Sequence, residues 1–166
     1  MRVIIVMGVS GSGKTTIGTL LAEALGWPFF EGDDLHPQAN VRKMAAGVPL
    51  TDEDRLPWLD KIRALVGTLV ESDQHAVIAA SVLKRSYRQH LDWEPIVRYV
   101  YLRGSVALIR KRLRQRQGHF MGTDMLASQM AVLEPPEEAI VVDIDAPAAA
   151  VVDSILSGLP TEGGLS

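Results

Sequence analysis

The eight residues from Gly8 to Thr15 have the types and the spacing needed to bind a nucleotide phosphate. Their sequence, GVSGSGKT, matches the pattern G-x-x-x-x-G-K-[ST] in full. The glycines let the backbone curl so that successive N–H groups point at phosphate oxygens, and a following helix directs the positive end of its dipole at the same anion. Lys14 would neutralise the β- and γ-phosphates, and the Thr15 hydroxyl would bind Mg²⁺. The residues predicted to bind ATP in this segment are Gly8, Val9, Ser10, Gly11, Ser12, Gly13, Lys14, Thr15 and Thr16.

The rest of the sequence narrows the class of nucleotide-binding protein. A GTPase switch requires a guanine-reading segment of the Asn-Lys-x-Asp type, which the sequence lacks. A mechanical ATPase usually has an apolar strand that ends in an acidic Mg²⁺ ligand. Residues 139–143 (AIVVD) fit that description, but they come late in a chain of 166 residues. We therefore interpret Asp143 and Asp145 as structural residues at a strand end; the alternative places them near the nucleotide base.

A second polar segment, residues 31–37 (EGDDLHP), follows a predicted strand. The carboxyl ends of parallel strands are where an open α/β sheet presents its ligand-binding groups. A carboxylate at such a place can accept the proton of an attacking hydroxyl, as the catalytic aspartate of a kinase does. We predict this role for Asp33, with Asp34 as its solvated neighbour. The alternative is that Asp33 caps a helix.

These two segments need a framework of strands and helices to position them. Short apolar runs predict five strands, at Val3–Met7, around Phe29 and Phe30, at Ala76–Ala80, at Ile96–Leu102 and at Ala139–Val142. Helical patterns separate them, at Lys14–Leu25, Pro37–Ala46, about 51–71, Leu83–Leu91, Val106–Gln117 and Ala148–Leu156. The alternation predicts a three-layer α/β fold in which a five-stranded parallel sheet has helices on both faces. No linker or repeat interrupts the chain, so residues 1–166 are expected to form one domain.

The composition favours a soluble, cytoplasmic protein. The 17 basic and 20 acidic residues leave a formal charge of −3, which gives no reason to expect a nucleic acid or an anionic membrane as a partner. The chain has no cysteine, which excludes disulfides and cysteine-bound metals and fits a reducing compartment. No stretch approaches the ~20 apolar residues that a membrane span needs. The apolar run at the N-terminus is too short for a signal peptide.

Beyond the phosphate loop, the sequence resembles the P-loop gluconate kinases from Arg2 to about Ile155. The acceptor-side segment at 32–37 (GDDLHP) is followed by the block at 49–59 (PLTDEDRLPWL). Further matching residues are Asn40, Lys43, Met44, Gly47, Ser81–Lys84, Tyr87, Arg88, Arg112, Leu113, Arg116 and Gly118–Phe120. The phosphate loop is shared with many enzymes, whereas the two acceptor-side blocks together are specific. Val82 stands where an alanine is usual, a departure that leaves the assignment intact.

The resemblance implies transfer of the γ-phosphoryl group of Mg-ATP to the 6-hydroxyl of D-gluconate, giving 6-phosphogluconate and ADP. It also implies a P-loop fold similar to that of nucleoside-monophosphate and shikimate kinases, with a mobile lid, and it leaves a homodimer open. By likeness to shikimate kinases, Asp33 matches the second aspartate of their D-x-D element, which holds and deprotonates the acceptor hydroxyl. Two other functions stay open: a kinase of another small acid or of a nucleotide, and a nucleotide-binding regulator without transfer activity.

Gluconate would require a guanidinium for its carboxylate and short polar groups for its five hydroxyls. Arg55 and Arg88 are the candidates for the carboxylate. The alternatives are that Arg55 is an exposed residue at a helix start and that Arg88 is a surface ion-pair partner. The candidates for hydroxyls or phosphate are His36, Asp54, Ser81, Lys84 and His119. Trp58 is interpreted as a core residue rather than a platform for the sugar.

The arginine-rich helix predicted at Val106–Gln117 leads into a segment flanked by glycines, GHFMG at 118–122. Arg112 and Arg116 are four residues apart and share a helix face. We predict that Arg112 binds the nucleotide and that Arg116 is a catalytic residue on the transferring phosphate. The segment at about 112–130 is expected to form a lid that closes over the site and excludes water. The alternatives are a solvated basic face or an RNA-binding patch, and no aromatic residues interleave with the arginines to favour RNA.

Overall fold

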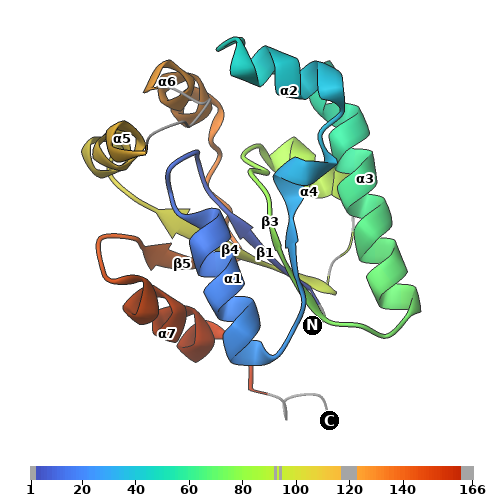
Figure 1. Cartoon of the computed structure of the whole chain (residues 1–166). Coiled ribbons are helices and arrows are strands. Elements are labelled where there is room, and N and C mark those ends of the chain that lie inside the picture. The colour runs from blue at the N-terminus through green and yellow to red at the C-terminus, as the bar shows by residue number, and fades with distance from the viewer. Residues whose placement is uncertain (1–2, 92, 94, 117–122, 162–166) are drawn as a thin grey trace.

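The computed structural model describes residues 3–91, 93, 95–116 and 123–161. Its centre is a sheet of five parallel strands in the order β2-β3-β1-β4-β5. The strands are β1 (Val3–Met7), β2 (Phe29–Glu31), β3 (Ala76–Ala79), β4 (Val97–Arg103) and β5 (Ala139–Asp143). All five predicted strands are confirmed. Strand β1 lies in the middle of the sheet, because it pairs with both β3 and β4 (Figure 1).

Helices connect the strands and cover both faces of the sheet. They are α1 (Lys14–Leu25), α2 (Gln38–Ala45), α3 (Asp52–Glu71), α4 (Arg85–Leu91), α5 (Val106–Gln115), α6 (Thr123–Val132) and α7 (Ala148–Gly158), with a short 3₁₀ helix, η1 (Gly32–Leu35). Helix α5 ends two residues earlier than predicted, because Arg116 adopts an extended backbone with φ −83° and ψ 108°. None of the described helices combines the length and the hydrophobicity that crossing a lipid bilayer requires.

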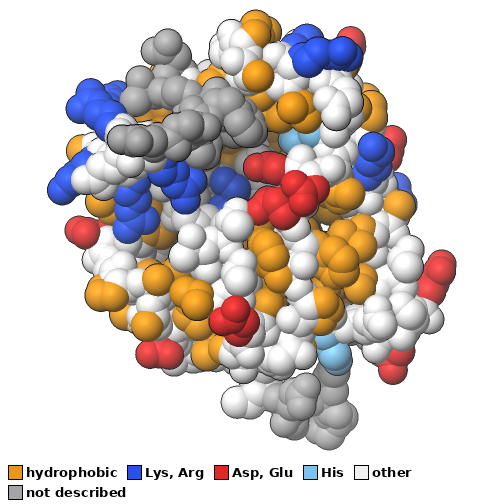
Figure 2. Space-filling view, in the orientation of Figure 1, with side chains coloured by type: hydrophobic (Ala, Val, Ile, Leu, Met, Phe, Trp, Pro, Cys, Tyr) orange, Lys and Arg blue, Asp and Glu red, His pale blue; other side chains and the backbone are white. Residues whose placement is uncertain are grey.

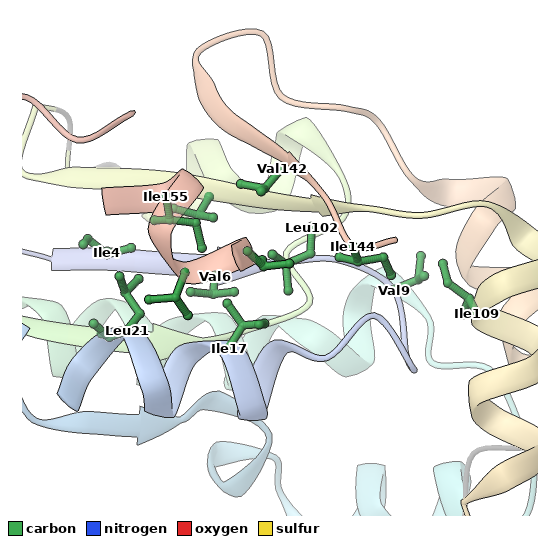
Figure 3. Packing of buried hydrophobic residues seen from close by; sticks show 14 of the residues in the cluster. Ile4, Val6, Val9, Ile17, Leu21, Leu102, Ile109, Val142, Ile144 and Ile155 are labelled. Atoms are coloured by element: carbon green, nitrogen blue, oxygen red, sulfur yellow. The ribbon is translucent and has the colours of Figure 1, made fainter. Parts of the chain in front are cut away.

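Side chains of β1 alternate between two cores, which is why this strand can be apolar throughout. Ile4 and Val6 pack with side chains of α1 and α7 on one face of the sheet (Figure 3). Ile5 and Met7 pack with side chains of α3 on the other face. All four are 0% exposed. Burial on both faces is typical of the centre of a parallel sheet, and it places the loop that follows β1 at the carboxyl edge of the sheet.

Helix α6 is missing from the sequence-based prediction, because most of its residues fall within the segment expected to form the lid. Its apolar residues do not gather on one face, so periodicity gives no helical signal. Met125 and Leu126 are nevertheless buried, and Leu126 joins the core that contains Ile4 and Val6. Tertiary packing therefore stabilises this helix. The lid at about 112–130 stays a prediction, and its residues 117–122 lie outside the described part of the chain.

Three local features position the phosphate loop, the end of β2 and the start of α3 at the carboxyl edge of the sheet. Gly13 has a φ of 94° and directly precedes α1, so the phosphate loop turns into the helix through a conformation that favours glycine. A Cβ on Gly32 would lie 2.3 Å from the carbonyl oxygen of Ala79, so only glycine lets the end of β2 approach β3 this closely. Helix α3 begins with a capping box, in which Thr51 and Asp54 each accept the backbone N–H of the other.

Candidate active site

The phosphate loop connects β1 to α1 at the end of the molecule where α2, α5 and α6 lie (Figure 1). Lys14 is the first residue of α1, and its Nζ donates a hydrogen bond to the carbonyl oxygen of Val9 at 3.1 Å. Burial lowers the pKa of Lys14, an effect that the carboxylates of Asp33 and Glu31 oppose. The Ser12 hydroxyl is buried without a hydrogen-bond partner among the described residues. A half-buried cation beside an unsatisfied hydroxyl suits a phosphate oxygen.

Glu31, the last residue of β2, lies beside the start of α1. The Thr15 hydroxyl donates a hydrogen bond to one oxygen of the Glu31 carboxylate. The other oxygen accepts the backbone N–H of Asp33 at 3.3 Å, so Glu31 caps η1. Burial raises the pKa of Glu31, and the hydrogen bond from Thr15 opposes that effect. A hydroxyl and a carboxylate beside the phosphate loop provide the hard oxygen atoms that Mg²⁺ prefers.

The carboxylate of Asp33 borders a pocket between η1 and α2. The pocket has a volume of about 430 Å³ and is lined by Asp33, Asp34, His36, Gln38, Val41 and Met44. The Asp33 side chain is 44% exposed, and its Oδ1 lies 4.0 Å from Nε2 of His36. In Figure 2, acidic side chains in the upper half of the molecule face basic side chains across a hollow. Because the cap of η1 is Glu31 and that of α2 is Pro37, Asp33 does not cap a helix.

A second cavity, of about 350 Å³, borders the phosphate loop. Its lining includes Gly11, Ser12, Gly13, Thr16, Ile17, Arg112, Arg116, Ile144, Ala146 and Val151. Arg112 donates a hydrogen bond from Nη2 to the carbonyl oxygen of Ile144 at 2.8 Å, which holds its side chain across the cavity edge. Arg116 lies close enough to Lys14 to contribute to the lowering of its pKa, after the larger effect of burial. The cavity therefore gathers the predicted nucleotide-binding residues of α1 and α5.

Arg55 and Lys84 meet around Tyr87, between α3 and α4. Lys84 Nζ donates to the Asp52 carboxylate at 2.8 Å, and the Tyr87 hydroxyl donates to the same carboxylate. Arg55 Nη1 donates to the Tyr87 hydroxyl at 3.3 Å and to the carbonyl oxygen of Leu50 at 2.6 Å. The guanidinium carbon of Arg55 lies 5.4 Å from the centroid of the Tyr87 ring. Two cations and one carboxylate leave this cluster with a positive charge that suits an anionic group.

Comparison with known proteins identifies the family. A family model described as an AAA domain matches residues 3–136. The gluconokinase of Gluconobacter oxydans is 48% identical over 136 residues, which cover 81% of this chain and 76% of that protein. The chain belongs to the gluconokinase family. The crystal structure of a gluconokinase from Sinorhizobium meliloti is 44% identical in sequence, with a TM-score of 0.83, and the match covers 95% of this chain and 90% of that one. The crystal structure of a sugar kinase from a Janibacter species is 40% identical, with a TM-score of 0.89, and the match covers 95% of this chain and 93% of that one. The predicted three-layer P-loop fold is thus confirmed.

Within this gluconokinase-family fold, Arg88 has a structural role that the sequence did not reveal. Its Nη1 donates to the carbonyl oxygens of Val82 and Leu83 at 2.9 and 3.0 Å, and its Nη2 donates to the carbonyl oxygen of Glu134 at 2.9 Å. Burial lowers its pKa. Arg88 therefore joins the loop after β3 to the segment after α6. The interpretation of Arg88 as a surface ion-pair partner is wrong, and its terminal nitrogens are already committed to backbone carbonyls.

The remaining predicted substrate residues differ in how far other contacts within the protein already engage them. Asp54 closes the capping box of α3 and pairs with Lys43 Nζ at 2.7 Å. The hydrogen bond from Lys43, the largest of several effects, lowers the pKa of Asp54 to about 2. Ser81 lies two residues beyond β3, at the carboxyl edge of the sheet, and is partly exposed. His119 lies outside the described residues. The substrate roles of these three residues stay predictions.

Two of the residues interpreted as structural, Trp58 and Asp143, make structural contacts; the role of Asp145 stays a prediction. Trp58 is 0% exposed, which confirms its place in the core, and its Nε1 donates to the carbonyl oxygen of Gly32 at 2.8 Å. Asp143 forms an exposed ion pair with Arg103, with 3.4 Å between the carboxylate oxygen and Nη2. Trp58 therefore anchors the residue directly before Asp33, while Asp143 is engaged by its neighbouring strand.

Sequence reasoning missed two side chains that contact the phosphate loop of this gluconokinase-family chain. Glu31 left a signal, since a second carboxylate two residues before Asp33 at the same strand end is a natural metal-binding neighbour. Gln129 left none: its Oε1 accepts the backbone N–H of Ser10 at 2.6 Å, although the two residues are 119 positions apart. Only the packing of α6 against the phosphate loop brings Ser10 and Gln129 together.

Proposed function

We propose that this protein is a gluconokinase that transfers the γ-phosphoryl group of ATP to the 6-hydroxyl of D-gluconate, giving 6-phosphogluconate and ADP. The observation that carries the proposal is the position of Asp33. Its charge acts on the half-buried Lys14 of a complete phosphate loop, and its carboxylate borders the pocket between η1 and α2, in a chain of the gluconokinase family. A group that can receive the hydroxyl proton therefore lies next to the group that would hold the phosphates.

The oxygen atoms beside Lys14 fit Mg²⁺. The Thr15 hydroxyl and the Glu31 carboxylate already meet through a hydrogen bond, and both are hard oxygen donors that would hold the ion. When bound, the ion supplies positive charge that offsets the charge between the β- and γ-phosphates. The unsatisfied Ser12 hydroxyl and the backbone N–H groups of the loop would take the remaining phosphate oxygens.

The protein side chains would supply positioning and charge, which phosphoryl transfer needs most. Lys14 would stabilise the charge that grows on the phosphates, from a half-buried position where such interactions are stronger than in water. Asp33 would orient the attacking hydroxyl and accept its proton as the new O–P bond forms and ADP departs. Arg112 and Arg116, which line the nucleotide cavity, would hold the nucleotide and add positive charge near the transferring group.

Arg55 is a better candidate than Arg88 for the gluconate carboxylate. Arg88 uses both terminal nitrogens on backbone carbonyls. Arg55 uses only Nη1, and among the described residues its Nη2 and Nε have no hydrogen-bond partner. Its charge contributes, after burial, to the lowering of the His36 pKa, so Arg55 lies near the pocket that Asp33 borders. With Lys84 beside it, the Arg55 guanidinium offers a carboxylate two nitrogens, Nη2 and Nε, that have no partner within the described chain.

The proposal is tested by measuring ADP release with a panel of acceptors. We expect turnover to depend on gluconate and to be low with shikimate, glucose or AMP. Strong turnover with AMP and none with gluconate would make the protein a nucleotide kinase instead. Absence of turnover with every acceptor, with ATP still bound, would favour a nucleotide-binding regulator.

A further inference from the structure

The imidazole of His36 is held in one orientation by buried neighbours. It stacks on the indole of Trp58, with ring centroids 4.4 Å apart and planes at 12°. The His36 side chain is only 3% exposed. The same indole donates its N–H to the carbonyl oxygen of Gly32, the residue directly before Asp33. Trp58 therefore fixes both the ring and the segment that carries the catalytic carboxylate.

Asn40 determines which nitrogen of this ring carries the proton. Its Nδ2 lies 2.8 Å from the carbonyl oxygen of Asp54 and 3.2 Å from Nδ1 of His36. A carbonyl oxygen can only accept, so the atom that faces it must be the amide NH₂ group, which has two hydrogens. The second hydrogen is then donated to Nδ1 of His36, which must be an unprotonated acceptor. Neutral His36 therefore carries its proton on Nε2.

The ring is also kept neutral. Within the described part of the chain, two charged groups face it, Asp33 from η1 and Arg55 from α3. Burial, the largest effect, and Arg55 lower the pKa of His36 to about 4, while Asp33 opposes them. At neutral pH the ring thus presents one N–H donor, on Nε2, toward Asp33. Among the described residues, Nε2 has no hydrogen-bond partner of its own.

We propose that His36 and Asp33 form a donor–acceptor pair that holds the attacking hydroxyl of the acceptor substrate. Nε2 and the Asp33 oxygen Oδ1 are 4.0 Å apart, which is too far for a direct hydrogen bond. A hydroxyl oxygen about 2.8 Å from both atoms would see them at an angle of about 90°, a geometry that one hydroxyl can satisfy. It would accept from Nε2–H of His36 and donate to Asp33. Asn40 is the positioning residue of this pair, because it holds the tautomer.

The pair explains how one hydroxyl is oriented toward the γ-phosphorus without losing the lone pair that must attack it. One lone pair of the oxygen accepts from His36, the proton passes to Asp33, and the other lone pair is left to form the bond to the γ-phosphorus. The transition state of phosphoryl transfer is loose, so aiming the oxygen matters more than raising its nucleophilicity. The opposite tautomer would present a lone pair to the oxygen and could not hold it. This inference rests on the proposed function, because it assumes a hydroxyl acceptor at Asp33.

The tautomer is tested directly by NMR of protein with ¹⁵N-labelled histidine, without substrate. The His36 signals are assigned by their loss in the His36→Gln variant. We expect a protonated Nε2 and an unprotonated Nδ1, unchanged between pH 6 and 8. A proton on Nδ1, or a charged ring in this range, would overturn the proposal. This measurement needs no catalytic turnover, so its outcome is independent of whether gluconate is the substrate.

The role of the donor is tested by kinetics with gluconate and Mg-ATP. His36→Leu removes the donor and is expected to lower kcat/KM for gluconate by about tenfold, the scale of one neutral hydrogen bond. His36→Gln places an amide N–H near the position of Nε2 and should restore most of that loss. KM for ATP should stay unchanged in both variants. Equal activity of His36→Leu and the wild type, or equal losses in the Leu and Gln variants, would contradict the pair.

A double-mutant cycle separates Asn40 from a general packing effect. Asn40→Leu should lower kcat/KM about as much as His36→Leu, and the double variant should lose no more than either alone. Additive losses would show that Asn40 does not act through His36. Arg42→Gln, an exposed change on the same helix, is the matched control and should leave both kinetic constants unchanged. If the wild type turns over a different acceptor, the cycle is run with that acceptor, so failure of gluconate refutes only the proposed function.

Discussion

Replacing Asp33 with asparagine should remove turnover while leaving the fold nearly intact. The carboxylate is 44% exposed, and it caps no helix, because Glu31 caps η1 and Pro37 occupies the cap position of α2. The asparagine amide has the same shape as the carboxylate it replaces, so the free energy of unfolding should change by less than about 0.5 kcal/mol, as for a surface substitution. The phosphate loop is unchanged in sequence, so ATP should still bind.

The expected change in the activation free energy of Asp33→Asn is much larger than the expected change in its free energy of unfolding. A positioned general base contributes about 10²- to 10⁴-fold to the rate. The lower bound corresponds to about 3 kcal/mol of activation free energy. The substitution also removes a charge that opposes the lowering of the Lys14 pKa, which can only add to the loss. We therefore expect kcat to fall at least about 100-fold.

Three measurements on one variant decide the matter: ATP affinity, melting temperature and kcat. Asp34→Asn, at the exposed neighbouring position, is the matched control and should lose far less activity. A coupled fall in ATP affinity and a changed Mg²⁺ dependence would show that Asp33 acts through the metal. Nearly normal kcat with a lowered melting temperature would refute the catalytic assignment.

Four further predictions follow from the other contacts. Lys14→Ala should lower kcat by at least about 100-fold. Its melting temperature should stay the same or rise, because burial of the lysine charge opposes folding. Near-normal turnover would show that Lys14 has no catalytic role. Arg55→Met should raise KM for gluconate about 10-fold or more through lost charged hydrogen bonds, whereas Arg88→Met should lower the melting temperature first; the reverse result would exchange their roles. Gly32→Ala should cost about 1–3 kcal/mol of stability, because its Cβ would meet a carbonyl oxygen at 2.3 Å; an unchanged melting temperature would contradict this packing. Asp54→Asn should lower the melting temperature at neutral pH. That difference in melting temperature should shrink as the pH falls from about 4 toward about 2, because protonation of Asp54 then removes the stability that its ionised carboxylate contributes. A difference that does not depend on pH would contradict the lowered pKa.

Much of the fold could be predicted because its signals are local. A continuous apolar run such as Val3–Met7 indicates that a strand is buried on both faces, and alternation with helices indicates that the sheet is parallel. The phosphate loop is contiguous in sequence, so its residues must lie together in any structure. The capping box that begins α3 is also local, because Thr51 and Asp54 are only three residues apart. Helix α6 lacks such a signal, since buried contacts rather than an amphipathic pattern stabilise it.

The sequence by itself determined the chemistry of this protein: a cradle for phosphates, an acid at a strand end and a surplus of candidate cations around them. Only the tertiary structure decided which candidates are free to act. Arg55 and Arg88 carry the same guanidinium, but folding brings three backbone carbonyls to Arg88 and leaves two nitrogens of Arg55 unbound within the described chain. Likewise, the proton of His36 is placed by an asparagine that is itself oriented by the carbonyl of Asp54. Hydrogen-bond partners distant in sequence are set by how elements pack, and residue types alone carry no record of that packing.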